Sequence, residues 1–417
     1  MVDRVRGFAG MYYDESDGTP VVLLTFAGDH AAASMHAPAF AKSHPRRLGE
    51  PIKPLRFAVA RYDFRQLRRW YTRALAVVAT APGLAYTDVD EVNNVIKIAV
   101  VDVAAVTAVN RLLAGLNIPS DAIAIPIEKP LQFQGAPSTP AAGWTTADKI
   151  RPATGGLLIS TSVGNCTLGF NTQKVRSAPQ AGSYVYDFQH YFVTVAHCMA
   201  QPGYSSGTIV AQGGTLYDNA YWIGQERRQP RWLGTQEYAD CPTNLKCSTA
   251  DAALIAYSYA DGAMAAIARP TGYNNGNTTF DPFEPYFYIA DSTQRQNSQL
   301  AGTLVSSVKG RSGWTSGYTR GTCTNQPYYW PGYYLLCSDT YAGANTEGDS
   351  GSPVFQVGLD GISVRMVGIH WGGDGGTVSA MSPYVNVRWE LTMADYNAQC
   401  GSIWECWLGL NVSGDWW

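Results

Sequence analysis

The sequence predicts a small α+β domain followed by a larger all-β domain. In residues 1–130, apolar residues recur at both helical and strand spacing. Residues 131–151 are rich in Pro, Gly, Ser, Thr and Ala, a composition that indicates an exposed linker with a processing site. Residues 152–417 contain short β-type runs separated by Gly, Asn, Asp and Pro, which fits Greek-key barrels or a sandwich. A chain of 417 residues exceeds one hydrophobic core, so two domains are expected.

The first domain begins with a predicted hairpin, in which two apolar runs flank the turn signal Asp17-Gly18. A polar, histidine-containing loop is expected next, and its His30, His36 and His44 are interpreted as surface residues. The elements that follow are a strand at Arg56–Ala60, a helix at 64–78 capped by Asp63, strands at 85–89 and 95–101, a helix at 106–116 and a strand at 122–127. Their β-α-β-β-α-β order predicts a split βαβ unit.

The composition excludes several kinds of partner. The formal net charge is -3, so no basic field for nucleic acid and no polybasic stretch for anionic lipid is present. No run of about 18 apolar residues occurs, which predicts that no segment spans a membrane. We therefore expect that the protein binds neither nucleic acid nor a membrane. We also expect it to be a monomer.

The cysteines predict an oxidising compartment. There are eight, all beyond residue 160, and short spacings favour pairing between sequential neighbours. The alternative, a structural zinc site, is disfavoured because no CxxC pair occurs. The expected disulfides are Cys166–Cys198, Cys241–Cys247, Cys323–Cys337 and Cys400–Cys406. Disulfides indicate secretion, although the first residues lack the apolar region of a signal peptide. We expect that such a signal was removed from this chain.

Three segments of the second domain carry chemistry: Thr194–Cys198, Asp251–Leu254 and Gly348–Pro353. Cutting an amide requires a nucleophile stronger than a serine hydroxyl, and an imidazole supplies one by taking the hydroxyl proton. His197 is the candidate base, and Ser350 the candidate nucleophile. A carboxylate on the other ring nitrogen fixes the tautomer and stabilises the imidazolium, which is the role predicted for Asp251. No metal or cofactor is required.

Glycines beside Ser350 allow a tight turn, so that the N–H groups of Gly348 and Ser350 converge on the oxyanion of a tetrahedral intermediate. Taken singly, each segment has an ordinary structural interpretation: a core histidine, a turn aspartate and a glycine loop. Their joint occurrence in this order favours the catalytic interpretation.

These segments resemble the chymotrypsin-like serine proteases, with which they share the chain order His, Asp, Ser. The resemblance covers about residues 152–395. It implies two six-stranded β-barrels with the site in the cleft between them, and a Cys166–Cys198 disulfide beside the histidine.

The stretch from Val308 to Gly317 is similar to the Arg-Ser-Gly segment of bacterial α-lytic and streptogrisin-type enzymes. In that branch the arginine pairs with the aspartate before the nucleophile, which implies an ion pair of Arg311 with Asp349. The alternative is a solvated arginine in a hairpin. Residues 1–130 resemble the pro-regions of such proteases, which implies folding catalysis and intramolecular inhibition. The competing interpretation of these residues is an independent binding module.

The strand at Val367–Gly373 is expected to bind substrate through His370, Trp371 and Gly372. Ala344 stands six residues before Ser350, where trypsins carry a basic-residue-selecting aspartate, so trypsin-like preference is not implied. The pairing of Gly-Ser-Pro-Val-Phe with Gly-Ile-His-Trp-Gly-Gly is similar to glutamyl endopeptidases, which implies that His370 binds a substrate carboxylate. The alternatives are that His370 bonds Asp251, or that Glu347 repels acidic substrates.

The sequence as a whole predicts a secreted serine endopeptidase that is made as a proenzyme. Its partners are expected to be polypeptide substrates and its own pro-region. The alternative is a latent or non-enzymatic binding protein on a protease scaffold, because fold and function are separable.

Overall fold

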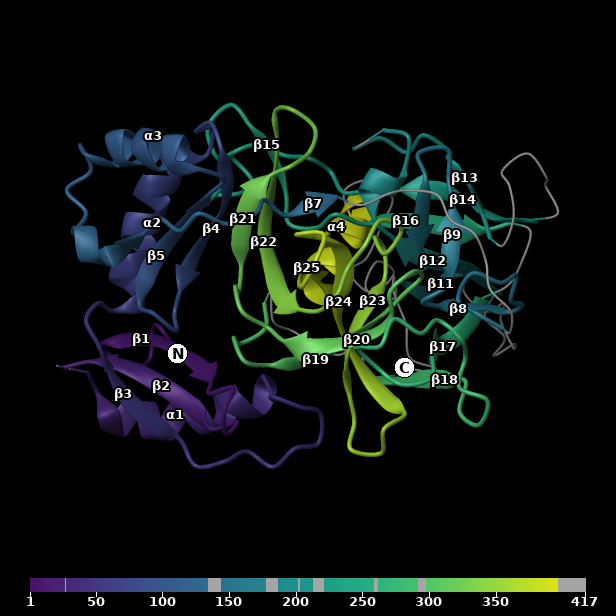
Figure 1. Cartoon of the computed structure of the whole chain (residues 1–417), viewed down its shortest axis with the longest axis horizontal. Coiled ribbons are helices and arrows are strands. Elements are labelled where there is room, and N and C mark those ends of the chain that lie inside the picture. The colour runs from purple at the N-terminus through teal and green to yellow at the C-terminus, as the bar shows by residue number, and fades with distance from the viewer. Residues whose placement is uncertain are drawn as a thin grey trace.

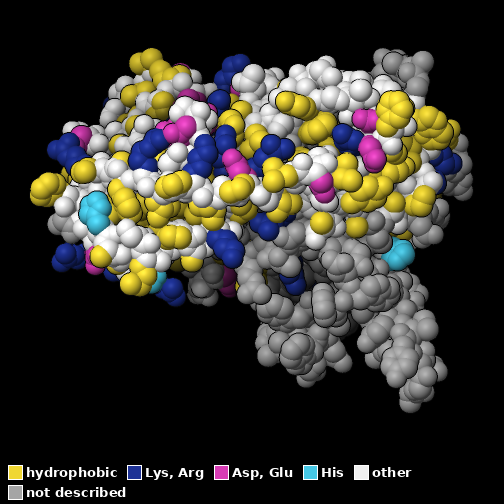
Figure 2. Space-filling model, turned by 90° about the horizontal axis from the view of Figure 1, so that it is seen from below, with side chains coloured by type: hydrophobic (Ala, Val, Ile, Leu, Met, Phe, Trp, Pro, Cys, Tyr) yellow, Lys and Arg dark blue, Asp and Glu magenta, His cyan; other side chains and the backbone are white. Residues whose placement is uncertain are grey.

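The structure is a computed structural model that describes residues 1–26, 28–133, 144–177, 187–201, 203–212, 221–258, 262–291 and 298–396. Figure 1 shows the elements of the first 130 residues gathered at one end of the molecule, with the β-rich remainder at the other. The face drawn in Figure 2 has Lys and Arg side chains interspersed with acidic and apolar ones over its described surface. No helix among the described residues is long and apolar enough to cross a bilayer.

The N-terminal residues form a three-stranded sheet with one helix. Strands β1 (Phe8–Tyr13) and β2 (Pro20–Thr25) are the antiparallel hairpin that the turn signal predicts, and β3 (Arg56–Ala60) pairs with β2 in parallel. Between β2 and β3 lies helix α1 (His30–Ser43), where the sequence predicts a polar loop. That prediction is wrong because Ala33, Ala37 and Ala41 recur at helical spacing and bury a narrow apolar face.

His44 ends helix α1 and is buried, contrary to the expectation of a surface residue. Its backbone N–H caps the helix by donating to the carbonyls of Phe40 and Ala41. Its Nδ1 lies 3.0 Å from the Phe40 carbonyl, and its ring lies 4.2 Å from that of Phe40. The buried imidazole is therefore accommodated by its contacts with the carbonyl and the ring of Phe40.

A second sheet follows, built from β4 (Leu84–Asp90), β5 (Val95–Val100) and β6 (Ile123–Ala124), with α3 (Val103–Leu113) and a 3-10 turn, η1 (Ser120–Ala122), between β5 and β6. Helix α2 (Phe64–Val78) packs against it and begins at the predicted cap, Asp63, whose side chain accepts from the N–H of Gln66. The single split βαβ sheet is not confirmed, since β3 pairs with β2 instead of joining β4 and β5. The crossover through α1 brings β3 to the open edge of β2.

The second sheet continues into the β-rich part of the chain through β21 (Thr324–Pro327). Thr87 of β4 pairs with Asn325 of β21 in antiparallel fashion. The hydroxyl of Tyr71, from α2, lies 2.8 Å from the Thr87 hydroxyl and accepts from the Asn325 amide at 2.8 Å. All three side chains are buried, so this junction is a packed and hydrogen-bonded interface.

The first barrel is a hydrogen-bonded ring. Its strands are β9 (Leu158–Ser160), β10 (Asn165–Thr167), β11 (Phe170–Ser177), β12 (Asp187–Thr194), β13 (Ile209–Ala211), β14 (Trp222–Arg228) and β16 (Ala253–Tyr257). The pairing order is β10-β9-β13-β14-β16-β12-β11. Since β10 and β11 are nearly continuous in sequence, one bent strand pairs with β9 at one end and β12 at the other. This closes the ring.

The second barrel closes in a similar way. Its strands are β19 (Leu304–Lys309), β20 (Gly313–Tyr318), β22 (Tyr333–Ala342), β23 (Pro353–Val357), β24 (Ser363–Gly373) and β25 (Val378–Pro383). The order is β20-β19-β23-β24-β25-β22, and a bridge between Thr319 and Tyr341 joins its two ends. These two rings match the predicted all-β double barrel, and helix α4 (Tyr384–Tyr396) follows.

The strands outside the two rings are β7 (Gln132–Phe133), β8 (Ala153–Gly155), β15 (Lys246–Ser248), β17 (Gly262–Ala268) and β18 (Tyr286–Asp291). Three of the expected disulfides are present: Cys166–Cys198, Cys241–Cys247 and Cys323–Cys337. Cys400 and Cys406 lie outside the described residues.

Carboxyl groups are buried where the N-terminal elements meet the second barrel. Asp88 on β4 is 3% exposed, and one of its carboxylate oxygens has no hydrogen-bond partner. Burial, with the neighbouring charges of Glu91 and Asp90, holds the pKa of Asp88 well above its usual range. Burial also raises the pKa of Glu91 to about 8 and that of Asp339, on β22, to about 6.

This cluster predicts a fold that becomes less stable as the pH rises. A carboxyl whose pKa is raised by folding binds its proton more tightly in the folded state. Its contribution is complete below the unfolded pKa of about 4 and is lost as the pH rises through the folded pKa. For Glu91 and Asp339 the loss falls between about pH 4 and pH 8.

We expect Asp88→Asn to weaken this dependence, because an amide carries no charge at either pH. The thermal unfolding midpoint of the full chain, measured at pH 5 and pH 8, is expected to fall less in the variant than in the wild type. Asp3→Asn, at an exposed aspartate outside this cluster, is the control and is expected to behave like the wild type. Equal pH dependence in Asp88→Asn and the wild type would contradict the expectation.

Candidate active site

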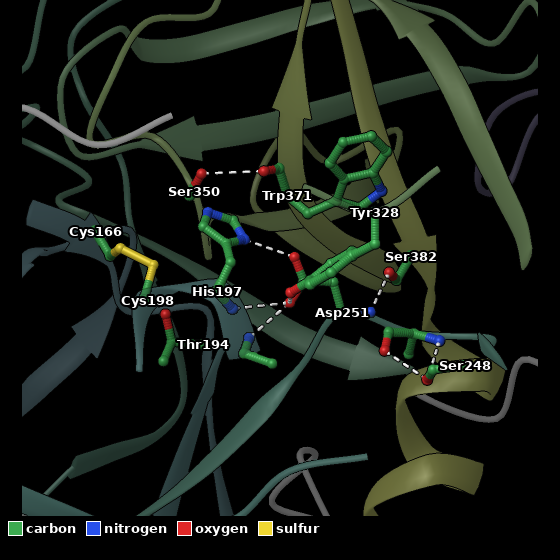
Figure 3. Close-up of polar contacts among 12 residues, drawn as sticks. Cys166, Thr194, His197, Cys198, Ser248, Asp251, Tyr328, Ser350, Trp371 and Ser382 are labelled. Carbon is green, nitrogen blue, oxygen red and sulfur yellow. Dashed lines mark hydrogen bonds and ion pairs between the residues drawn. A yellow bond between two sulfur atoms is a disulfide. The ribbon is translucent and has the colours of Figure 1, made fainter. Parts of the chain in front are cut away.

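His197 and Asp251 are brought together by two neighbouring strands of the first barrel. His197 lies in a 3-10 turn, η2 (Ala196–Cys198), directly after β12, and Asp251 directly precedes β16. These strands pair so that Thr194 lies opposite Ala253. The Nδ1 atom of His197 is 2.5 Å from the Oδ2 atom of Asp251 (Figure 3). Asp251 is fully buried and His197 is 7% exposed.

The other oxygen of Asp251 is held by three donors. The backbone N–H groups of Ala196 and His197 donate to Oδ1 at 2.7 and 3.1 Å, and the Tyr328 hydroxyl donates to it at 3.2 Å. A buried carboxylate whose oxygens are satisfied in this way is held in one orientation. The imidazole is thereby oriented with Nδ1 on Asp251, and Figure 3 shows its ring lying between Asp251 and Ser350.

Ser350 lies in the loop between β22 and β23 of the second barrel. It is fully buried, and its hydroxyl donates to the backbone carbonyl of Trp371, on β24, at 3.0 Å. The structure therefore brings the three predicted residues together from two barrels, with the hydroxyl turned toward β24.

The backbone around Ser350 adopts conformations that require glycine. Gly348 and Gly351 have φ values of +94° and +96°, in the left-handed region. A Cβ atom on Gly351 would lie 2.2 Å from the Thr167 carbonyl oxygen, so a side chain has no space there.

Only every second N–H group of this loop donates a hydrogen bond within the described chain. Those of Asp349 and Gly351 donate to the carbonyls of Thr346 and His370, at 3.1 and 2.7 Å. Those of Gly348 and Ser350 donate to no group within the described part of the chain. These two are the N–H groups that the sequence predicts for an oxyanion hole, and both remain available to a ligand.

Asp349 belongs to this loop, and its side chain is fully buried. It accepts from the backbone N–H groups of Arg311 and Ser312, each at 3.0 Å, from that of Thr346 at 2.8 Å, and from the Ser312 hydroxyl at 2.5 Å. The contact between Arg311 and Asp349 thus runs through the arginine backbone, and the ion pair of their side chains stays a prediction. Burial raises the pKa of Asp349, while the positive charge of Lys309 lowers it.

The predicted substrate-binding residues lie on β24. His370 and Trp371 are fully buried. The His370 Nδ1 atom lies 3.2 Å from the Tyr341 hydroxyl, whereas the oxygens of Asp251 are taken by other donors. The alternative interpretation, a hydrogen bond from His370 to Asp251, therefore has no support in this structure.

Part of the predicted linker lies along the same strand. In β7, Phe133 pairs with Gly372 and Gln132 pairs with Gly373, in antiparallel register. The residue preceding Gly372 is Trp371, whose carbonyl accepts from Ser350. A segment of the chain thus adds a strand to β24 beside the candidate nucleophile.

Two positioning residues were missed by the sequence analysis. Tyr328 donates to Asp251, and the Ser382 hydroxyl on β25 accepts from the Asp251 N–H at 3.0 Å. Tyr328 belongs to an aromatic cluster, and no spacing rule relates it to Asp251, which is 77 residues earlier. Within the described ranges, no group of three or more His, Cys, Asp or Glu residues could hold a metal ion.

No protein-family model and no curated protein matches the chain. Similar solved structures include Nocardiopsis protease (NAPase), with 20% identity over 55% of this chain and 91% of that chain and a TM-score of 0.35. Thermobifida fusca protease A has 17% identity over 56% of this chain and 92% of that chain, with a TM-score of 0.34. A glutamic acid-specific serine protease that uses a histidine triad in substrate binding has 16% identity over 55% and 93%, with a TM-score of 0.35.

These solved structures are bacterial serine proteases, the class that the sequence resembles. Their TM-scores are all below 0.5.

Tyr328→Phe tests the support of Asp251. A hydrogen bond to a charged group contributes about 1.5–3 kcal/mol, so its loss is expected to slow labelling of Ser350 by a fluorophosphonate about tenfold or more. The rate of labelling, followed by mass spectrometry, measures this. Tyr329→Phe is the control, since the Tyr329 ring lies 6.3 Å from that of His197 and the hydroxyl that donates to Asp251 is that of Tyr328. Equal rates in Tyr328→Phe and the wild type would exclude a role for Tyr328.

Proposed function

We propose that this protein is a secreted serine endopeptidase that hydrolyses peptide bonds through an acyl-enzyme and is made as a proenzyme. The observation that carries the proposal is the His197–Asp251 hydrogen bond of the first barrel, placed against the Ser350 loop of the second. The two uncommitted N–H groups of Gly348 and Ser350 supply the remaining requirement, a site for the oxyanion.

In the proposed reaction, an extended peptide pairs with β24. One of its N–H groups donates to the Trp371 carbonyl in place of the Ser350 hydroxyl. The Ser350 hydroxyl then turns toward His197, which accepts its proton as the oxygen attacks the substrate carbonyl. The oxyanion is held by the N–H groups of Gly348 and Ser350, and Asp251 stabilises the imidazolium. His197 returns the proton to the leaving amine, and water repeats these steps to release the acid product.

Latency of the intact chain is supported by β7. A substrate strand and β7 would use the same edge of β24, at Gly372 and Gly373, so they compete for it. The packed junction between β4 and β21 keeps residues 1–130 attached while β7 is in place. We propose that these residues are an inhibitory pro-region and that cleavage in residues 131–151 relieves the inhibition.

Secretion is supported by the three disulfides of the described β-rich domain, because such bonds persist in oxidising compartments.

A second candidate function, a latent or non-catalytic binding protein on the same scaffold, is favoured by one observation. The Ser350 hydroxyl is bonded to Trp371 and is not directed at His197. Labelling by a fluorophosphonate after the linker has been cut separates the two, since a binding protein would form no Ser350-dependent adduct even then.

Ser350→Ala is expected to abolish processing of the chain. Loss of the nucleophile lowers turnover on the order of 10⁶-fold. Mass spectrometry of the full chain over time is expected to show trimming within residues 131–151 only in the wild type. Ser363→Ala, at the far end of β24, is the control and is expected to process normally. Retained processing and peptide cleavage in Ser350→Ala would overturn the proposed function.

Phe133→Pro is expected to weaken latency, because proline lacks the N–H group and disfavours a paired strand. The full-length chain of this variant should react with a fluorophosphonate several-fold faster than the wild type, as measured by label in the uncleaved band on a gel. Phe133→Ala keeps the backbone pairing and should label like the wild type. If both variants label at the wild-type rate, β7 does not obstruct the site.

A further inference from the structure

A cavity of about 730 Å³ lies between the N-terminal elements and the second barrel, and the proposed mechanism does not use it. One side is lined by residues of β1, β4 and β5, among them Tyr13 and Asp88. The other side is lined by the second barrel and its loops, among them Arg320 and Asp374. Exposed residues such as Glu15 and Arg320 form part of the lining, so the cavity is open to solvent. Its volume is in the range of pockets that bind small molecules.

The charged residues that line this cavity are mainly acidic. Six are acidic, namely Asp14, Glu15, Asp88, Asp90, Glu128 and Asp374. Three are basic, namely Lys97, Lys129 and Arg320. Some of these carboxylates have cationic partners, since Asp14 pairs with Arg56 at 2.7 Å and Glu128 pairs with Lys97 at 2.8 Å. The excess of negative charge favours a ligand of positive charge.

The side chain of Asp88 faces this cavity. Tyr86, Asp88 and Asp90 alternate along β4, so their side chains lie on one face of the strand, and all three line the cavity. Lys97, which is paired with Asp88 across β4 and β5, lines it as well. The intervening residue Thr87 faces the opposite way and contacts α2 through its hydroxyl. The pleat of β4 therefore directs the Asp88 carboxylate into the cavity.

The carboxylate of Asp88 lacks the partners that a buried charge requires. Asp88 is 3% exposed, and its Oδ1 atom has no hydrogen-bond partner within the described part of the chain. The cation opposite it, Lys97, pairs with Glu128 instead. A buried polar group without a partner is costly and rare in native structures. Burial, with the charges of Glu91 and Asp90, raises the pKa of Asp88, so that the empty site retains a proton which a cation could replace.

An organic cation with N–H donors fits these features better than a metal ion. Among the described residues, no group of three or more His, Cys, Asp or Glu could hold a metal ion. A primary ammonium or a guanidinium needs only one carboxylate and donates charge-assisted hydrogen bonds directly to it. The cavity is also lined by Tyr12, Tyr13 and Tyr86, and the faces of aromatic rings attract such cations.

We propose that this cavity binds a small organic cation, a primary ammonium or guanidinium compound, with Asp88 as its counter-ion. Because both the N-terminal elements and the second barrel line the cavity, the bound cation contacts both. The inference goes beyond the proposed protease function and does not depend on it. The competing role for Asp88 is a protonated carboxyl group that requires no ligand, and this role predicts no cation binding that depends on Asp88.

The first test is calorimetric titration of the full chain with putrescine at low ionic strength. Ser350→Ala serves as the background, so that the linker stays uncut whether or not the chain is a protease. We expect saturable binding at one site. Hexamethylated putrescine has the same charge but no N–H group, and it should bind about tenfold or more weakly because it cannot donate to Asp88. The proposal fails if putrescine shows no saturable binding, or if the two cations bind with equal affinity.

Two substitutions in the same background test the role of Asp88. Asp88→Asn removes the counter-charge and is expected to weaken putrescine binding about tenfold or more. Lys97→Gln removes the cation opposite Asp88 and is expected to tighten binding several-fold, which a loss of folding cannot do. Asp3→Asn, at an exposed aspartate that does not line the cavity, is the control and should leave the affinity unchanged.

Equal affinities in Asp88→Asn and Asp3→Asn would overturn the proposal. If Asp88→Asn does not fold, Lys97→Gln decides, and an affinity that this variant does not raise overturns the proposal as well.

Discussion

The arrangement of the site depends on one residue, Thr167, which joins the two barrels. Its N–H donates to the Ser350 carbonyl at 2.7 Å, and its hydroxyl donates to the Gly348 carbonyl at 2.8 Å. Its own carbonyl accepts from the Thr194 hydroxyl at 2.9 Å, three residues before His197. Thr167 therefore links the nucleophile loop of one barrel to the histidine strand of the other. Since all of these groups are buried, each would be costly to leave without a partner.

The buried charged groups of the two barrels have different hydrogen-bond partners. In the first barrel, Asp251 has every oxygen occupied by protein donors, so its charge is stabilised and its orientation is set. In the second barrel, Asp349 is satisfied by backbone N–H groups, while Lys309 is bonded to neutral acceptors. The first arrangement holds the carboxylate in one orientation. The second leaves the Lys309 ammonium with uncharged hydrogen-bond acceptors.

The N-terminal residues are connected to the site by two different contacts. One is the buried junction of β4 with β21, where Thr87 and Tyr71 meet Asn325. The other is the pairing of β7 with β24, next to Trp371. The first contact contains buried carboxyl groups, whose protonation depends on the pH. The second contact consists of backbone pairing, for which a substrate strand would compete. The two effects therefore act on different contacts of the N-terminal residues with the β-rich domain.

The sequence by itself determined the identity of the candidate triad, the change from an α+β to an all-β domain, and three disulfides within the described chain. These depend on local chemistry, namely residue type, spacing and turn residues. Only the tertiary structure decided that β3 joins β2, that Tyr328 supports Asp251, that Lys309 is buried and that β7 lies on β24. Those features come from contacts between residues far apart in the chain, and no period or motif in a single sequence encodes which partners meet.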